Sequence, residues 1–268
     1  MKIKITEVQT VIKEIQTGHK PIMALCEDGN TYFVKRRKTN KPNDCEIISE
    51  FVCSAFLRLW EINTPKIKGI IVDPALLRSG MPSPNPSWLD HQNGVCFGSR
   101  KLENPIEITS ILNLNKIRGV KRFANPYDFF RIGLFDLWLV NEDRNWNNPN
   151  LLLLDTKGKF DFYAMDHAYT FGTRNFDELD DQLLAPHNDS ILDSSFAKKI
   201  IKGLPAQLPD FHKYFQQSVN LCHSNHEQIL KSIESCLGIT IPGKQPLEQF
   251  LYDSGRLTKI YSEFQTYF

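Results

Sequence analysis

The chain has 268 residues, of which 41% are hydrophobic and 24% are charged, and its formal net charge is +1. This length suits one large domain or two closely packed lobes. The balanced charge argues against a nucleic-acid partner, and the lack of a long apolar run argues against a signal peptide or a membrane span.

The first hundred residues are predicted to form mainly strands and one helix. Strands are expected at residues 2–7, 11–15, 21–26 and 31–35, with the turn sequence EDGN between the last two, so that residues 11–35 form a three-stranded meander. A helix is expected to begin at Asn43 or Asp44 and to end before Asn63, because apolar residues recur every four positions. A strand at 67–72, a loop at 76–93 and a strand at 95–100 follow.

The rest of the chain is predicted to be mainly helical. Asn125 and Pro126 mark a helix start, and that helix is expected to run to about Val140. Two apolar strands are expected at 151–155 and 160–165, and helices at 193–203, 208–237 and 246–264. We therefore expect an α+β protein with a small antiparallel-sheet lobe that contains one helix (residues 1–102) and a larger helical lobe (residues 103–268).

A polar run at residues 141–150 lies between an apolar helix and an apolar strand. Such a run is expected at the edge of the core, where functional residues are commonly carried on loops. The strand after it leads away, a Lys-Gly turn reverses the chain, and the next strand leads back. Asp143, Asn148 and Asp166 are therefore predicted to lie close together.

These three groups fit the transfer of a phosphoryl group. Mg²⁺ prefers oxygen ligands and keeps several waters, so Asn148 and Asp166 would suffice as protein ligands. Asp143 would act as the base that takes the proton of an acceptor hydroxyl, and the Asp-x-x-x-x-Asn spacing is that of protein-kinase catalytic loops. The alternative is that these residues only cap a turn, a hairpin and a helix.

The first lobe is predicted to contribute groups that bind phosphate. Lys35 ends a strand, and Glu50 on the following helix is the best candidate to hold it, with Glu46 as the alternative. Gly18 lies in a turn where the backbone would approach phosphates, and Lys20 would add a cation. An ordinary hairpin turn explains Gly18 about as well.

The chain resembles the HipA-like kinases, bacterial serine/threonine kinases with a divergent kinase fold, and above all their compact single-domain relatives. The resemblance rests on five segments in this order: TGHKPIMALCEDGNTYFVK, SEFVCSAFLRLWEINTP, VCFGSRKL, NEDRNWNNPNLLLLD and FYAMDHAYTFG. They span residues 15–172.

The resemblance implies a two-lobed protein-kinase-like fold that uses ATP and Mg²⁺. It implies that Lys35 binds ATP phosphates with Glu50 as its partner, that Asp143 is the catalytic base, and that Asn148 and Asp166 bind Mg²⁺. It also implies that the backbone of Cys96, Phe97 and Gly98 contacts adenine. Better-known members of the family have a histidine where this chain has Asn145, and they carry an additional N-terminal subdomain.

The acceptor is left open by these motifs. A serine or threonine of a protein is the first expectation. A small-molecule kinase of the aminoglycoside or lipid type has the same Asp and Asn arrangement, and a non-catalytic nucleotide-binding protein is the third alternative. Six cysteines without a CxxC pair favour a reducing, cytoplasmic setting.

Overall fold

The computed structural model describes residues 2–16, 20–37, 45–80, 88, 94–108, 119–186 and 190–268. The chain forms two compact units. Unit 1 comprises residues 1–54, 65–103 and 227–242, and unit 2 comprises residues 55–64, 104–226 and 243–268. Because these units interleave along the chain, the division into lobes at residues 1–102 and 103–268 stays a prediction.

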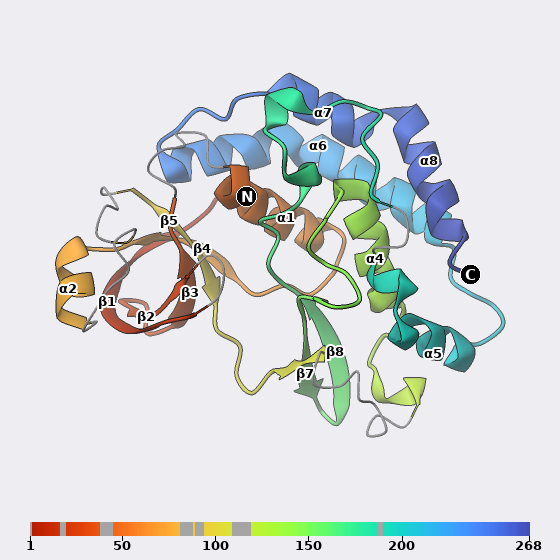
Figure 1. Ribbon diagram of the computed structural model, residues 1–268, viewed down its shortest axis with the longest axis horizontal. Coiled ribbons are helices and arrows are strands. Elements are labelled where there is room, and N and C mark those ends of the chain that lie inside the picture. Colours follow the sequence, from red (N-terminus) through yellow and green to blue (C-terminus); the bar gives the residue numbers. More distant parts are fainter. Residues whose placement is uncertain are drawn as a thin grey trace. The chain divides into compact units, whose positions relative to one another are not determined.

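Unit 1 is built on a closed five-stranded barrel (Figure 1). Its strands are β1 (Ile5–Glu14), β2 (Ile22–Cys26), β3 (Thr31–Lys35), β4 (Ile67–Ile71) and β5 (Cys96–Arg100), in the order β1-β2-β3-β5-β4. Four of the strand pairs are antiparallel, and the pair β1–β4 that closes the barrel is parallel. The expected antiparallel sheet is thus corrected to a mixed barrel, whose closure removes both exposed sheet edges.

Strand β1 replaces two strands that were predicted separately. Its register with β2 shifts between Val8 and Thr10, and again between Val11 and Lys13. Such bulges bend a strand and increase its twist. The strands predicted at 2–7 and 11–15 are therefore one bent strand, whose curvature helps to close a small barrel.

The barrel interior is a continuous hydrophobic core. Its buried residues are Val8, Val11, Ile22, Ala24, Cys26, Tyr32, Val34, Ile70, Val72, Leu77, Trp88 and Cys96. On the strands they alternate with more exposed residues, as one buried sheet face requires.

Unit 1 contains more helix than the single one expected. Residues 45–54 of α1 (Cys45–Leu59), the whole of α2 (Pro74–Gly80) and the end of α6 (Phe211–Leu237) belong to it. The loop predicted at 76–93 was wrong at its start, because α2 has Pro74 at its first position and the Asp73 carboxylate accepts a hydrogen bond from the backbone N–H of Ala75 (2.8 Å).

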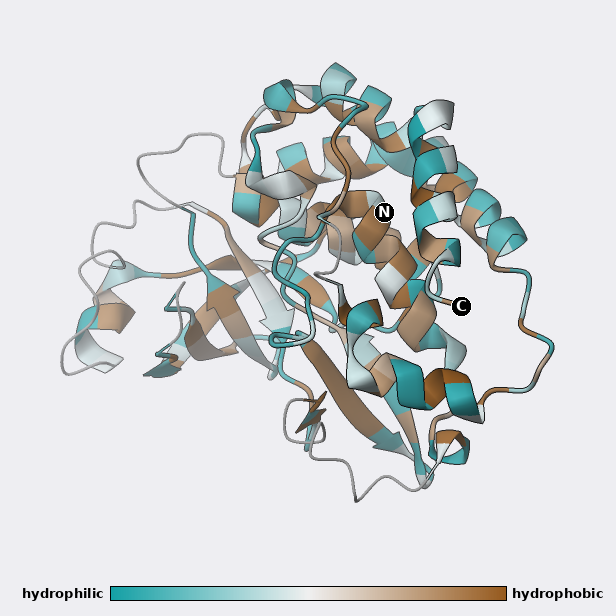
Figure 2. Ribbon diagram, turned by 45° about the vertical axis from the view of Figure 1, so that its right-hand side comes forward, coloured by the Kyte–Doolittle hydropathy of each residue, from teal (hydrophilic) through white to brown (hydrophobic). Residues whose placement is uncertain are grey.

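Unit 2 is centred on α4 (Tyr127–Leu139), in which eleven of thirteen residues are buried. A three-stranded sheet in the order β6-β7-β8 includes the predicted hairpin, β7 (Leu151–Thr156) and β8 (Lys159–Ala164), and the unpredicted short strand β6 (Ile106–Glu107). In Figure 2 the two hairpin strands are hydrophobic along much of their length and hydrophilic at their turn. This pattern agrees with the burial of Leu151, Leu152 and Leu153.

The other helices of unit 2 pack around α4 through aromatic side chains. Trp60 stacks on Trp138 of α4 (ring centroids 5.3 Å apart) and meets Phe215 of α6 edge-on (5.9 Å). The helix α5 (Ser195–Gly203) agrees with expectation, and α6 runs unbroken. The helix expected at 246–264 is two helices, α7 (Lys244–Tyr252) and α8 (Ser254–Gln265). Elsewhere in the unit there are short 3₁₀ turns at Val120–Arg122, Phe171–Thr173, Phe176–Glu178 and Ile191–Asp193.

The break between α7 and α8 has a local cause. Asp253 has an extended backbone, and its side chain accepts a hydrogen bond from the N–H of Arg256 (2.7 Å), which caps α8. Of the helices that the structure describes, none combines the length and the apolar character that a bilayer span requires.

Candidate active site

The polar loop after α4 is fixed at its start by a cap. The backbone N–H of Asn141 donates to the carbonyl of Asp136 (3.0 Å), and the Asn141 side-chain oxygen accepts from the N–H groups of Asp143 and Arg144 (3.2 Å each). An asparagine that accepts two successive backbone N–H groups holds a tight turn. The side chain of Asp143 is therefore presented by a defined backbone.

The Asp143 carboxylate lies between two amides. Asn148 Nδ2 donates to its Oδ1 (2.8 Å), and Asn150 Nδ2 donates to its Oδ2 (2.8 Å). A second turn orients the first of these amides, because the Asn145 side chain accepts from the N–H groups of Asn147 (2.9 Å) and Asn148 (3.0 Å). Both carboxylate oxygens are thus held, while each keeps lone pairs for a further donor.

The hairpin returns the chain to this loop as predicted. Leu151 pairs with Ala164, and the N–H of Met165 donates to the carbonyl of Asn150 (3.1 Å). Asp166 follows directly, in the left-handed conformation with φ of 57°. The structure therefore brings the backbone of Asp166 next to the loop that carries Asp143 and Asn148.

In unit 1, the structure pairs Lys35 with Glu50. Lys35 ends β3, and its Nζ lies 2.6 Å from Glu50 Oε1 on α1. Glu50 is 1% exposed, whereas the alternative partner Glu46 is only half-buried in the first turn of the helix. The geometry therefore selects Glu50 between the two candidates.

The residues proposed for a phosphate loop are only partly described. Gly18 lies outside the described residues. Lys20 has a left-handed backbone (φ 44°) and an exposed side chain, and its carbonyl accepts a hydrogen bond from Trp88 Nε1 (2.9 Å). The exposed Lys20 ammonium is therefore open to a ligand.

The structure places Cys96, Phe97 and Gly98 inside β5, which pairs with β3 on one side and with β4 on the other. Many of the backbone groups of these residues are paired within the sheet, and their contact with adenine stays a prediction. Gly98 also serves packing, because a Cβ there would lie 2.3 Å from Cγ1 of Ile70.

Three groups of the site were missed in the sequence. Arg144 follows Asp143 and is 1% exposed, and Asp136 is a buried acid within the apolar helix α4. The signal for this pair was the carboxylate of Asp136 in the otherwise apolar second half of α4, since buried charges need partners. Trp146 was also overlooked, and its exposed fraction of 50% is unusual for a tryptophan.

The oxygen atoms of this loop suit a hard cation. The side-chain NH₂ group of Asn148 donates to Asp143, so the side-chain oxygen Oδ1 is the atom that could bind a metal. Among the described residues there is no group of three or more His, Cys, Asp or Glu that would hold a metal ion. That finding is compatible with Mg²⁺, which is commonly held by one or two protein oxygens together with phosphates and waters.

The electrostatics of α4 also bear on the loop. Burial raises the pKa of Asp136 to about 6, although Arg144 and the Asn141 amide act in the opposite direction. The carboxyl faces Arg144 as an ion pair, with Nη1 2.5 Å from Oδ1.

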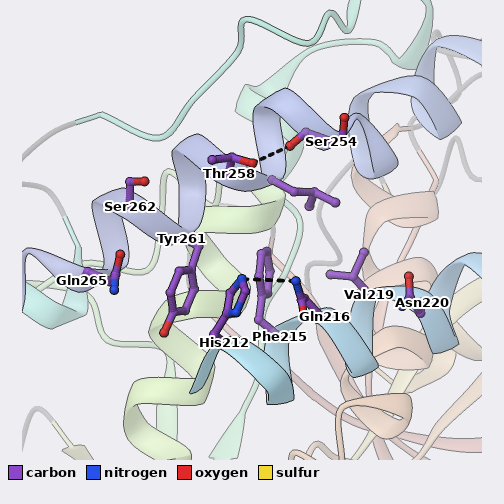
Figure 3. Close-up of a pocket in the computed structure, with 11 residues that line it drawn as sticks. His212, Phe215, Gln216, Val219, Asn220, Ser254, Thr258, Tyr261, Ser262 and Gln265 are labelled. Atoms are coloured by element: carbon purple, nitrogen blue, oxygen red, sulfur yellow. Dashed lines mark hydrogen bonds between the residues drawn. The ribbon is translucent and has the colours of Figure 1, made fainter. Parts of the chain in front are cut away.

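A separate groove lies between α6 and α8 of unit 2 (Figure 3). It encloses about 810 Å³ and is lined by His212, Phe215, Gln216, Val219, Asn220, Ser254, Leu257, Thr258, Tyr261, Ser262 and Gln265. No carboxylate, lysine or arginine is among these lining residues. Phosphates and Mg²⁺ need charged partners, so we assign the chemistry to the loop of Asp143 and not to this groove.

The sequence of the chain matches one family of known proteins. The sequence model described as HipA-like kinase matches residues 6–221. A search of proteins with curated functions gave no match to this chain.

Two solved structures similar to the chain are kinases. The Helicobacter pylori proinflammatory kinase CtkA shares 15% identity at a TM-score of 0.53, over 99% of this chain and 97% of that one. A Golgi casein kinase shares 12% identity at a TM-score of 0.50, over 99% of this chain and 72% of that one. At these identities the likeness concerns the fold alone, which is kinase-like and of mixed α+β class.

Proposed function

Because the chain belongs to the HipA-like kinase family, we propose that it transfers the γ-phosphoryl group of Mg-ATP to a serine or threonine hydroxyl of a protein. The observation that carries the proposal is the arrangement around Asp143, with its carboxylate held by Asn148 and Asn150. Asp166 adds a second carboxylate, joined to the same loop through the hydrogen bond of Met165 to Asn150.

Each group of the loop has a chemical role in this proposal. Asp143 accepts the proton of the acceptor hydroxyl, whose oxygen bonds to the γ-phosphorus as the bond from phosphorus to the β–γ bridging oxygen breaks. Asn148 Oδ1 and the Asp166 carboxylate would hold Mg²⁺. The bound metal supplies positive charge that offsets the charge of the phosphates.

The Lys35–Glu50 pair of unit 1 supplies a cation for phosphate. Lysine is a compact point charge on a flexible stem, so its ammonium can turn to a phosphate while an acid holds the stem. Glu50 lies in the second turn of α1 and is nearly inaccessible to solvent, so it keeps Lys35 pointed in one direction. Lys20 would add an exposed second cation.

The hydrogen bonds at the end of β5 bear on where the backbone would contact adenine. The N–H of Arg100 donates to Lys66 and that of Lys101 donates to Thr31, so the ladder hydrogen bonds continue to residue 101. We place the backbone contact with adenine on residues 102–105, which follow β5. The contact expected from the backbone of Cys96, Phe97 and Gly98 is the alternative to this placement.

The setting and the larger architecture belong to the proposal as well. A cytoplasmic location is supported by six free cysteines, five of them buried. A division into two lobes near residue 102 is supported by the family, whose members share a kinase fold.

The test is transfer of label from γ-labelled ATP in the presence and absence of Mg²⁺. Purified protein would be incubated alone and with a generic protein acceptor, beside Asp143→Asn and a control, Asp161→Asn on β8. We expect Mg²⁺-dependent label on serine or threonine with the wild type and the control, and a loss of at least about 10²-fold with Asp143→Asn.

The two alternatives give different results in the same assay. When small hydroxyl compounds are added as further acceptors, label on them and none on protein would contradict the protein acceptor and establish a small-molecule kinase. Binding of Mg-ATP without any transfer would contradict catalysis and leave a nucleotide-binding protein.

A further inference from the structure

Arg144 lies at a junction of three segments of unit 2. Its Nη1 donates to Asp136 Oδ1 on α4 (2.5 Å), and its Nη2 donates to the carbonyl of Met165 (2.7 Å) and meets His167 Nδ1 (3.1 Å). The Arg144 side chain is fully buried. One guanidinium therefore joins the loop of Asp143 to α4 and to the turn after β8.

The chemistry of these contacts calls for arginine. A guanidinium presents five donors in a fixed plane, so it serves a carboxylate, a carbonyl and an imidazole at the same time. Since arginine only donates, His167 Nδ1 must accept, which fixes the proton of the neutral ring on Nε2. Arg144 thus also sets the tautomer of the residue next to Asp166.

The two Nη2 contacts bracket Asp166. A positive φ is unfavourable for a residue other than glycine, by roughly 1–2 kcal/mol, and persists where the surroundings hold it. Met165, on one side, is held by Asn150 through its N–H and by Arg144 through its carbonyl. His167, on the other side, is held by Arg144, and its carbonyl accepts from Thr170 Oγ1 (3.0 Å).

We infer that Arg144 is a positioning residue: anchored on Asp136, it fixes the turn that carries Asp166 against the loop that carries Asp143 and Asn148. The inference rests on the proposed function, in which those residues hold the metal and take the proton. It assigns Arg144 no contact with substrate, because its side chain is fully buried and both of its Nη atoms donate to protein groups.

The test compares Arg144→Lys with a matched control, Arg131→Lys. Lysine keeps the charge but cannot serve three partners in one plane. Arg131 also pairs with an acid, Asp128 (3.0 Å), but it lies in the first half of α4, away from the loop that carries Arg144. Each variant is measured for amide hydrogen exchange without nucleotide, and for the Mg²⁺ concentration that gives half-maximal phosphorylation.

We expect Arg144→Lys to speed exchange at both 141–150 and 165–170 by at least about tenfold, with little change in the hairpin β7–β8. We expect the half-maximal Mg²⁺ concentration to rise by about 10- to 100-fold, the range found when residues that support metal ligands are changed. Arg131→Lys should change neither quantity. Exchange that stays at the wild-type rate in 165–170, or activity that falls with no change in the Mg²⁺ requirement, would overturn the inference.

A second variant covers the case in which Arg144→Lys does not fold. The double variant Asp136→Leu with Arg144→Met leaves no buried charge unpaired, and such replacements are often well tolerated. It should fold and still show fast exchange in both segments. If the wild type transfers no phosphoryl group, the proposed function fails, and the exchange measurement still decides whether Arg144 joins the two segments.

Discussion

Each of the two units contains a buried ion pair between a helix acid and a cation outside that helix, and the two pairs differ in access. In unit 1, the side chains of Lys35 and Glu50 are 14% and 2% exposed. In unit 2, those of Arg144 and Asp136 are 0% and 4% exposed. The lysine keeps a path to solvent, whereas the arginine has none.

This difference in solvent access distinguishes a side chain that can bind a ligand from one that positions other parts of the protein. A lysine with some solvent access can keep its acid and still reach a phosphate, so the first pair suits a nucleotide. An arginine with no access to solvent and three protein partners supports the surrounding fold and does not reach a ligand. The same combination of charges therefore suits ligand binding in one unit and support of the fold in the other.

The largest loss of stability is expected when the fully buried pair Arg144–Asp136 is broken. Asp136→Ala leaves the Arg144 guanidinium buried without its carboxylate, which should lower the free energy of unfolding by about 3–5 kcal/mol. Urea denaturation measures this loss. The double variant Asp136→Leu with Arg144→Met is the control and should lose much less. A loss below about 1 kcal/mol in the single variant would show that the pair is not closed to solvent.

The pair Lys35–Glu50, whose lysine is partly exposed, should matter most for turnover. Lys35→Ala is expected to lower kcat/KM for ATP by at least about 10²-fold, because the cation that offsets phosphate charge is removed. Lys68→Ala is the matched control, since Lys68 also pairs with an acid in the same barrel, Asp28 (2.5 Å). Steady-state kinetics at saturating Mg²⁺ measure both variants. Equal losses in the two would mean that Lys35 has no special role.

A third pair, Asp128 with Arg131, is intermediate, with side chains 12% and 23% exposed. Burial raises the pKa of Asp128 to about 6, above the value of about 3.9 in an unfolded chain. The folded protein therefore holds this proton more tightly, and the stability that it contributes below pH 4 is lost as the pH rises to about 6.

The Asp128→Asn variant tests that sign. It has no such titration, so the stability of the wild type relative to the variant should fall by about 1–2 kcal/mol between pH 4 and pH 6. Denaturation at a series of pH values measures the difference. A difference that stays constant, or that grows with pH, would contradict the raised pKa.

The smallest effect concerns Trp146, which lies three residues after Asp143 and is half exposed. Because three residues span at most about 11 Å, groups flanking an acceptor hydroxyl at Asp143 lie within reach of the indole. Trp146→Ala should raise KM for a protein acceptor about three- to tenfold and leave KM for ATP unchanged. Peptide phosphorylation kinetics measure both constants, and an unchanged acceptor KM would exclude this contact.

Much of the fold follows from local patterns that the sequence displays. The EDGN turn, the helix start at Asn125 and the hairpin after residue 150 are each set by short-range preferences, and all three were predicted. The closure of the barrel was not, because β1 and β4 pair across about sixty residues and no local signal encodes that pairing. The bulges in β1 similarly disguised one strand as two.

The site divides in the same way. Spacing along a loop and a hairpin predicted that Asp143, Asn148 and Asp166 converge, and a strand-end lysine before a helix predicted the Lys35–Glu50 pair. Arg144 was missed, because its three partners come from α4 and from the turn after β8, and only tertiary structure joins them. The pairing of β5 on both sides was likewise not visible in the sequence, so the adenine contact through Cys96, Phe97 and Gly98 stays a prediction.

The most direct measurement is the binding of a non-hydrolysable ATP analogue by calorimetry, with and without Mg²⁺, to the wild type and to Asp166→Asn. If Asp166 and Asn148 hold the metal, Mg²⁺ should tighten binding to the wild type by at least about tenfold, or about 1.4 kcal/mol, and the variant should lose that gain. An equal gain from Mg²⁺ in both proteins would contradict the assignment of the metal to this loop.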